Sequence, residues 1–124
     1  MDKKRILIVD DEEDIISILK LRLEANNYEV LSAHDGQEGL NKARSEKPDL
    51  IILDLMLPKL DGYKVCSMLK FDKHYSAIPI IMFTARAQKE DEELGKKMGA
   101  DGYIHKPFES EILLKKIKEL LEKA

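Results

Sequence analysis

The chain has 124 residues, a length that fits one domain with a hydrophobic core of its own. Hydrophobic residues make up 44% of the chain and charged residues 36%, which excludes a disordered segment and indicates a soluble, folded chain. The net charge of −3, with both signs mixed along the sequence, argues against a nucleic-acid-binding face.

Short apolar runs alternate with amphipathic stretches along the whole sequence. In chain order we predict a strand at 6–9, a helix at 12–26, a strand at 28–33, a helix at 37–45, a strand starting at 50, a helix at 63–71, a strand at 78–83, a helix at 88–98, a strand at 103–105 and a helix at 109–123. Five strand–helix repeats with short connections predict an α/β fold, with helices on both faces of a parallel sheet. No linker is visible, so we expect a single domain over residues 1–124 without an output domain.

The third predicted strand contains one carboxylate that needs an explanation. Residues 50–58 are apolar except for Asp54, as in a strand that is buried on both faces. Pro58 is expected to end this strand because proline cannot donate to a strand ladder. A lone carboxylate in such a strand is costly unless it lies at the strand end with partners. Asp54 therefore predicts a functional site.

Polar side chains also end other strands of the predicted sheet. Asp10 and Asp11 follow the first strand, Thr84 follows the fourth, and Lys106 follows the fifth. Because the carboxyl ends of parallel strands meet at one edge of the sheet, we expect these side chains to gather around Asp54. Asp10 and Asp11 are also candidates for capping the first helix.

This set of groups indicates phosphoryl chemistry. Three clustered carboxylates would take up protons unless a cation joined them, and oxygen ligands suit Mg²⁺, with Mn²⁺ as an alternative. Lys106 and the Thr84 hydroxyl could then hold a tetrahedral anion such as a phosphoryl group. We predict that Asp54 is the nucleophile and forms an acyl phosphate, because it lies centrally among the other groups.

Five short motifs support a family assignment, since they occur in order and on the expected elements. They are Asp10-Asp11; Asp54 with Leu55-Met56-Leu57-Pro58 and Asp61-Gly62; Thr84-Ala85; Gly99-Ala100-Asp101-Gly102-Tyr103; and Lys106-Pro107-Phe108. Over essentially its whole length the chain resembles a response-regulator receiver domain of two-component signalling, similar to the stand-alone chemotaxis regulators. The resemblance implies a flavodoxin-like, doubly wound (βα)5 fold in three layers, with strand order 2-1-3-4-5.

The same resemblance implies roles for the matching acidic residues and the lysine. Asp54 would accept a phosphoryl group from a phosphohistidine. Asp11 and Asp54 would ligate Mg²⁺ together with the backbone carbonyl of Met56, while Asp10 would act mostly through water. Lys106 would pair with the phosphoryl oxygens.

Further residues are implied in switching and in tuning. Thr84 would move to bond the phosphoryl group, and Tyr103 would turn inward behind it. The peptide bond between Lys106 and Pro107 is expected to be cis. Met56 and Arg86 match positions that tune loss of the phosphoryl group, and their bulk suggests a longer-lived phosphorylated state.

The first helix carries more apolar residues than one buried stripe needs. Ile15, Leu19 and Leu23 form an i, i+4, i+8 row and are the expected core contacts. Ile18 and Leu21 fall outside this row, and we predict that they help to dock the kinase, although a helix wedged between the sheet and the last helix would explain them nearly as well. The predicted docking residues are Asp14, Ile18, Leu21, Arg22, Pro107 and Phe108.

The resemblance implies protein partners rather than a substrate. The phosphoryl donor would be a sensor histidine kinase or a histidine phosphotransfer protein, and a downstream protein would dock on the fourth helix, fifth strand and fifth helix. We expect a monomer or a phosphorylation-dependent homodimer, with no direct contact to nucleic acid and no turnover activity. Only one cysteine is present, Cys66, and the N-terminus is too short for a signal peptide or membrane span, so we expect a cytoplasmic protein.

Three alternatives remain open at this point. The chain could be a receiver domain excised from a longer DNA-binding regulator. It could be a phosphatase with an aspartyl-phosphate intermediate, although such enzymes usually carry a second Asp two residues after the nucleophile, where this chain has Met56. It could also be a flavin-binding module, but the acidic run at 10–13 would repel a phosphate.

Overall fold

The computed structural model describes residues 3–85 and 89–123. Its elements are β1 (Arg5–Val9), α1 (Glu13–Ala25), β2 (Glu29–Ala33), α2 (Gly36–Glu46), β3 (Leu50–Leu53), α3 (Gly62–Lys70), β4 (Ile80–Thr84), α4 (Lys89–Lys97), β5 (Gly102–His105) and α5 (Ser110–Lys123). The strands form one parallel sheet in the order β2-β1-β3-β4-β5, which confirms the predicted α/β doubly wound fold. None of the helices in the described part of the chain has the length and apolar character needed to span a membrane.

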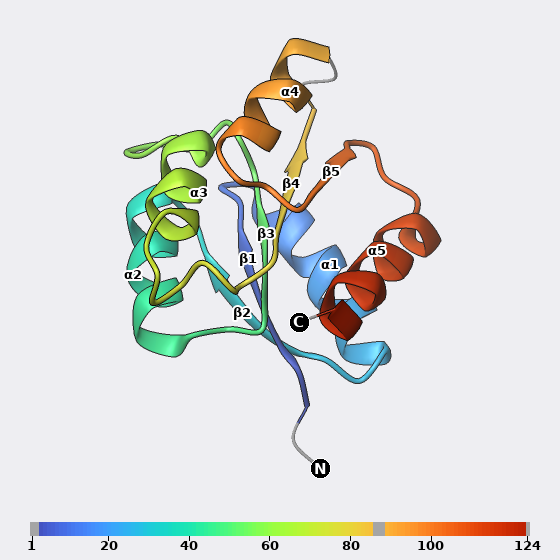
Figure 1. Cartoon of the computed structure of the whole chain (residues 1–124). Helices are drawn as coiled ribbons and strands as arrows, with labels where there is room; N and C mark the ends of the chain where they lie inside the picture. The colour runs from blue at the N-terminus through green and yellow to red at the C-terminus, as the bar shows by residue number, and fades with distance from the viewer. Residues whose placement is uncertain (1–2, 86–88, 124) are drawn as a thin grey trace.

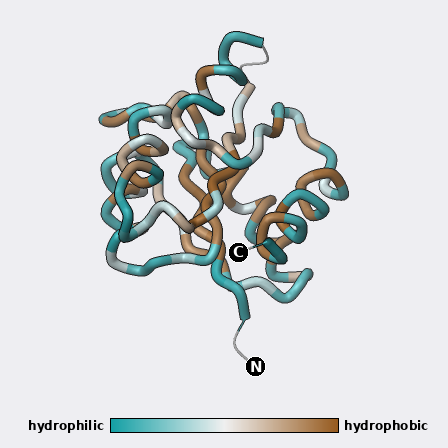
Figure 2. The backbone as a smooth tube through the Cα atoms, in the orientation of Figure 1, coloured by the Kyte–Doolittle hydropathy of each residue, from teal (hydrophilic) through white to brown (hydrophobic). Residues whose placement is uncertain are grey.

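Two hydrophobic clusters fill the space on the two faces of the sheet. Alternate residues of a strand point to opposite faces, so Leu7 and Val9 of β1 join one cluster while Ile6 and Ile8 join the other. The first cluster packs against α2 and α3, and the second against α1 and α5 (Figure 1). Figure 2 shows the hydrophobic strands at the centre and hydrophilic stretches along the outer helices. The fold therefore has three layers, as predicted.

The third strand is shorter than its apolar run predicts, because it ends at Leu53. Asp54 still donates its backbone N–H to the Val9 carbonyl at 3.0 Å, but the chain then turns into a loop that leads to α3. Leu55 is buried, and Leu57 and Leu60 pack against the first cluster. The apolar character after Asp54 thus reflects a loop folded onto the core, which a strand pattern cannot distinguish from a continued strand.

Two helices differ from their predicted packing. In α1, Ile16 joins Leu19 and Leu23 in the buried row, whereas Ile15, which we predicted there, is only half-buried. The helix is rotated so that the spacing i, i+3, i+7 faces the sheet. In α4, Asp91 is buried, although a helix made mostly of charged residues is expected to be solvated.

Candidate functional site

Asp10 and Asp54 lie side by side at the carboxyl edge of the sheet. The register pairs Val9 of β1 with Leu53 of β3, so the next residue of each strand is one of the two aspartates. Both are buried: Asp10 is 0% exposed and Asp54 is 5% exposed. Asp11 follows on the loop and is exposed to solvent. The structure therefore brings the three predicted carboxylates together.

Lys106 bridges the two buried aspartates. Its Nζ donates to Asp10 Oδ2 at 2.8 Å and to Asp54 Oδ2 at 3.2 Å, and it also lies 3.3 Å from Glu12 Oε1. The lysine backbone is fixed as well, since its N–H donates to the Thr84 carbonyl at 2.8 Å. The ammonium group lies 5.2 Å from the centroid of the Phe83 ring. The peptide bond to the following proline is cis, as expected.

The pKa values of these groups respond to burial and to the ion pair in opposite ways. Burial raises the pKa of Asp10, and this outweighs the lowering by its hydrogen bonds from Lys106 and from the backbone N–H of Glu12. Burial alone would lower the pKa of Lys106, but the hydrogen bond with Asp10 and the charge of Asp54 outweigh it, so the pKa of Lys106 is raised. Lys106 therefore remains a cation among carboxylates.

The acidic groups at this edge form a site that could hold a metal ion. One carboxylate oxygen from each of Asp10, Asp11, Glu12 and Asp54 lies within 4.8 Å of the others. A donor set made only of oxygens fits a hard divalent cation. Asp10 Oδ1 accepts the backbone N–H of Glu12 at 2.9 Å, which holds the loop after β1 against the site. Asp10 thus shapes this loop. The N-cap residue of α1 is Glu12, so the prediction that Asp10 or Asp11 caps this helix is wrong.

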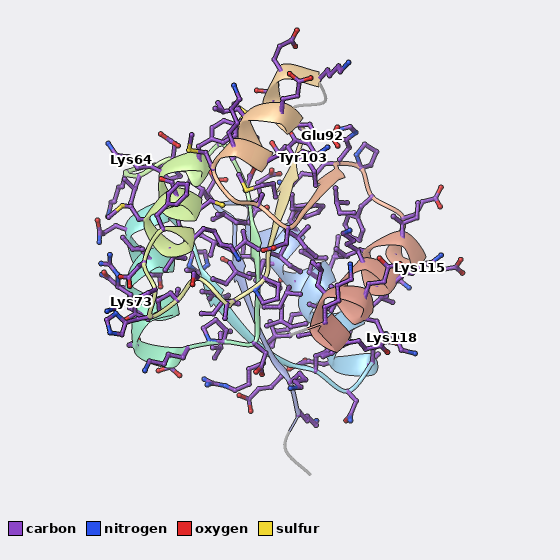
Figure 3. All side chains as sticks on the ribbon, viewed as in Figure 1. Lys64, Lys73, Glu92, Tyr103, Lys115 and Lys118 are labelled. Carbon is purple, nitrogen blue, oxygen red and sulfur yellow. The ribbon has the colours of Figure 1, made fainter. Side chains whose placement is uncertain are left out.

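Thr84 and Met56 line the pocket that contains Asp54, whereas Tyr103 does not line this pocket. Thr84 is the buried last residue of β4 and lines the same pocket as Asp54 and Lys106. Tyr103 is half-buried on β5, where it pairs in register with Met82, and lies beside α4 near Glu92 (Figure 3). Met56 is 61% exposed at the mouth of the pocket, and its N–H donates to Asp54 Oδ1 at 3.3 Å.

Most of the predicted docking residues lie on the surface. Ile18 is 48% exposed and Leu21 is 72% exposed, as expected for residues outside the core row. Phe108 differs, because it is half-buried and packs edge-on against Phe83 with the ring centroids 5.1 Å apart. The exposed members of the set are Asp14, Ile18, Leu21, Arg22 and Pro107. Arg86, predicted to tune phosphoryl loss, lies outside the described residues.

Sequence reasoning missed two features of this region. Glu12 was not singled out, although it immediately follows Asp11 at the same edge of the sheet and contacts Lys106. The hydrogen bond that links Tyr63 of α3 to Asp91 of α4 was missed as well, since nothing in the charge run 89–97 marks one acidic residue as buried. Proximity to Asp11 could have suggested Glu12.

Comparison with known proteins identifies the family of the chain. The family model "Response regulator receiver domain" matches residues 6–118, and the chain belongs to this family. Among curated relatives, the alkaline phosphatase synthesis transcriptional regulatory protein PhoP of Bacillus subtilis is 47% identical over 98% of the chain and 50% of its own length. The response regulator ArlR of Staphylococcus aureus is 44% identical over 96% of the chain and 53% of its own length. The chain thus spans about half the length of these relatives.

Solved structures give the same result. The CheY-like receiver domain protein of Methanospirillum hungatei superimposes with a TM-score of 0.92 and 38% identity, covering 98% of this chain and 96% of that one. The chemotaxis protein CheY4 of Vibrio cholerae gives a TM-score of 0.89 and 34% identity, covering 96% of this chain and 99% of that one. The receiver fold therefore accounts for nearly the whole chain.

Proposed function

We propose that the chain is a phospho-accepting receiver domain in which Asp54 takes a phosphoryl group from a phosphohistidine. The donor is a sensor histidine kinase or a histidine phosphotransfer protein. The observation that carries the proposal is the contact of Lys106 with both Asp10 and Asp54, at 2.8 and 3.2 Å, at the buried edge of the sheet. Membership of the receiver family supports it independently.

In the proposed reaction a carboxylate oxygen of Asp54 attacks the phosphorus atom. The new P–O bond forms as the P–N bond of the donor breaks, and the imidazole leaves with the electron pair. Asp10, Asp11 and Asp54, with the Met56 carbonyl, would hold Mg²⁺, which when bound offsets the charge between carboxylates and phosphoryl oxygens. Lys106 pairs with one phosphoryl oxygen. One phosphoryl group is accepted per chain, so the domain acts as a switch rather than a turnover enzyme.

The switch is proposed to run from the site to the surface formed by α4, β5 and α5. Thr84 donates its hydroxyl to the phosphoryl group, and Tyr103 turns inward behind it. Moving a two-state equilibrium from 1:99 to 99:1 requires about 5.5 kcal/mol of differential binding. Charge-assisted bonds from Thr84 and Lys106 are together of that order. A downstream protein then docks on the changed surface, as a partner of a monomer or of a phosphorylation-dependent homodimer.

Two further roles belong to surface residues. Met56, at the mouth of the pocket, together with Arg86, would slow loss of the phosphoryl group by hindering the attacking water. The exposed part of α1 around Ile18 and Leu21 would receive the helices of the phosphotransfer partner, aided by Asp14, Arg22, Pro107 and Phe108. The proposal places the domain in the cytoplasm, where ATP-dependent phosphohistidine donors are formed.

Incubation with a small phosphodonor and Mg²⁺, followed by intact mass measurement, tests the proposal. We expect a gain of one phosphate mass that disappears when the metal is chelated and is absent in Asp54→Ala. A gain that survives Asp54→Ala, or that does not need the metal, would contradict the assignment.

A second candidate is the same receiver activity within a DNA-binding transcriptional regulator. It is favoured because several relatives are named as transcriptional regulators. The match also covers 98% of this chain but only 50% of the length of PhoP. Sequencing the gene beyond the codons for this chain, to find whether a DNA-binding domain follows, decides between the two.

A further inference from the structure

Glu12 is the solvent-facing member of the three carboxylates that contact Lys106 in the described part of the chain. Its Oε1 lies 3.3 Å from Lys106 Nζ, and 61% of its side chain is exposed, compared with 1% for Asp10 and 6% for Asp54. The pocket around Asp54 is lined by Glu12 together with Asp11, Met56, Thr84, Ala85 and Lys106. Glu12 therefore lies on the exposed side of this pocket, where a phosphodonor for Asp54 would approach.

Helix capping does not explain this placement. Glu12 occupies the N-cap position of α1, yet its side chain makes no capping hydrogen bond to the helix. The carboxylate instead reaches Lys106, 94 positions away in the sequence. In the resting state Lys106 is thus shared between two buried aspartates and one exposed glutamate, and an arriving phosphoryl group must compete with Glu12 for the ammonium group.

We propose that Glu12 is a specificity-determining residue for the phosphodonor, selecting against freely diffusing, doubly negative donors. The proposal rests on the phospho-acceptor role of Asp54. A doubly negative acyl phosphate is repelled by the Glu12 carboxylate more strongly than a singly negative donor. A protein donor can offset this repulsion with cations of its own at the contact surface, which a small acyl phosphate cannot do.

Two small donors of different charge test the proposal. Acetyl phosphate is doubly negative at neutral pH and phosphoramidate is singly negative. Each donor transfers its phosphoryl group to an Asp54 oxygen. Acetate leaves from acetyl phosphate. Ammonia leaves from phosphoramidate, whose nitrogen is already protonated before the transfer. The measurement is the initial rate of phosphate addition by intact mass at saturating Mg²⁺ for the wild-type chain, Glu12→Gln and Glu13→Gln.

Glu13→Gln is a matched control, because it removes the same charge from the next residue. Glu13 is also exposed, and its carboxylate pairs with His34 at 2.7 Å rather than with Lys106. We expect Glu12→Gln to raise the initial rate with acetyl phosphate by about 10-fold at low salt and the rate with phosphoramidate clearly less. Glu13→Gln should change neither rate markedly. The gain should shrink as salt rises, since the Debye length is about 10 Å at 0.1 M.

Several outcomes would overturn the proposal. Donor selection by Glu12 would be rejected if Glu12→Gln raised the rates with both donors equally or raised neither rate. It would also be rejected if Glu13→Gln had the same effect as Glu12→Gln. A weaker Mg²⁺ affinity in Glu12→Gln, measured by titration, would assign the carboxylate to the metal instead. If the wild-type chain accepts phosphate from neither donor, the proposed function itself fails, whereas normal wild-type labelling with an unchanged donor preference in Glu12→Gln rejects only this inference.

Discussion

Gly62 is the point at which α3 comes closest to the site. An added Cβ there would overlap the carbonyl oxygen of Asp54 and lie 2.7 Å from the Cα of Leu55. The Gly62 N–H donates to the Leu55 carbonyl at 3.0 Å, which ties the start of the helix to the loop that follows Asp54. The absence of a side chain thus allows the helix to begin directly against the backbone that holds the predicted nucleophile.

Gly62→Ala is therefore expected to destabilise the domain by roughly 1–3 kcal/mol, because backbone atoms rather than a flexible side chain must move. Gly95→Ala in α4 is the control: its added Cβ would meet Tyr103 at 3.6 Å and Met82 at 3.7 Å, which are ordinary contacts. Alanine in a helix interior is favoured over glycine by up to about 1 kcal/mol, so this variant should be neutral or more stable. Urea unfolding measures the free energy of unfolding of both variants. An equal loss of stability in the two variants would refute the steric explanation.

At the scale of elements, α3 and α4 are joined through a polar contact at the edge of the sheet. The Tyr63 hydroxyl lies 3.0 Å from the backbone oxygen of Asp91 and 3.1 Å from its Oδ1. Asp91 is buried in the first turn of α4, where a negative charge suits the helix dipole. Because α3 follows the Asp54 loop and α4 follows β4, this contact connects two segments that both leave the candidate site.

Tyr63→Phe should loosen α4 without disturbing the core. Removing the hydroxyl deprives a buried carboxylate of one partner, which costs about 1–3 kcal/mol. We expect faster amide hydrogen exchange across α4, measured by mass spectrometry. Tyr75→Phe is the matched control, since Tyr75 is partly buried against the same core cluster as Tyr63 and its hydroxyl makes no hydrogen bond within the described part of the chain. Unchanged exchange in α4 of Tyr63→Phe would show that the contact does not hold the helix.

Sequence patterns predicted the elements well and some of their packing poorly, for physical reasons. The carboxyl ends of parallel strands meet at one edge, so Asp10, Asp54 and Lys106 could be placed together before any side chain was seen. The buried row of α1 could not be fixed, because a small rotation of the helix exchanges Ile15 for Ile16. Side-chain direction is equally invisible: Glu12 turns toward Lys106 by its choice of rotamer.

Across the whole molecule, the fold concentrates like charges at one edge of the sheet. The group contains four carboxylates, from Asp10, Asp11, Glu12 and Asp54, and one ammonium group, from Lys106, so its formal net charge is −3. The two hydrophobic clusters hold the strands that carry these groups in place. Packing therefore maintains a repulsive arrangement, which a bound cation would relieve.

A divalent cation should consequently stabilise the native chain. The acidic residues follow β1 and β3 and meet only in the folded state, so cation binding to them would favour folding by RT ln(1 + [L]/Kd). At 100 times Kd this is about 2.7 kcal/mol, which corresponds to a rise in Tm of roughly 10 °C for a domain of this size. Thermal unfolding with Mg²⁺ and with a chelator measures the shift.

Asp11→Asn should lose most of this shift, because Asp11 is an exposed member of the acidic group and its replacement leaves the buried core intact. Glu93→Gln, which removes an exposed carboxylate from α4, should keep the shift. A Tm that does not respond to Mg²⁺ in the wild-type chain would rule out the metal site. An equal rise in Tm with Mg²⁺ in Asp11→Asn would mean that the cation binds elsewhere. Lys106 would then have to offset the carboxylates at the sheet edge without a metal ion.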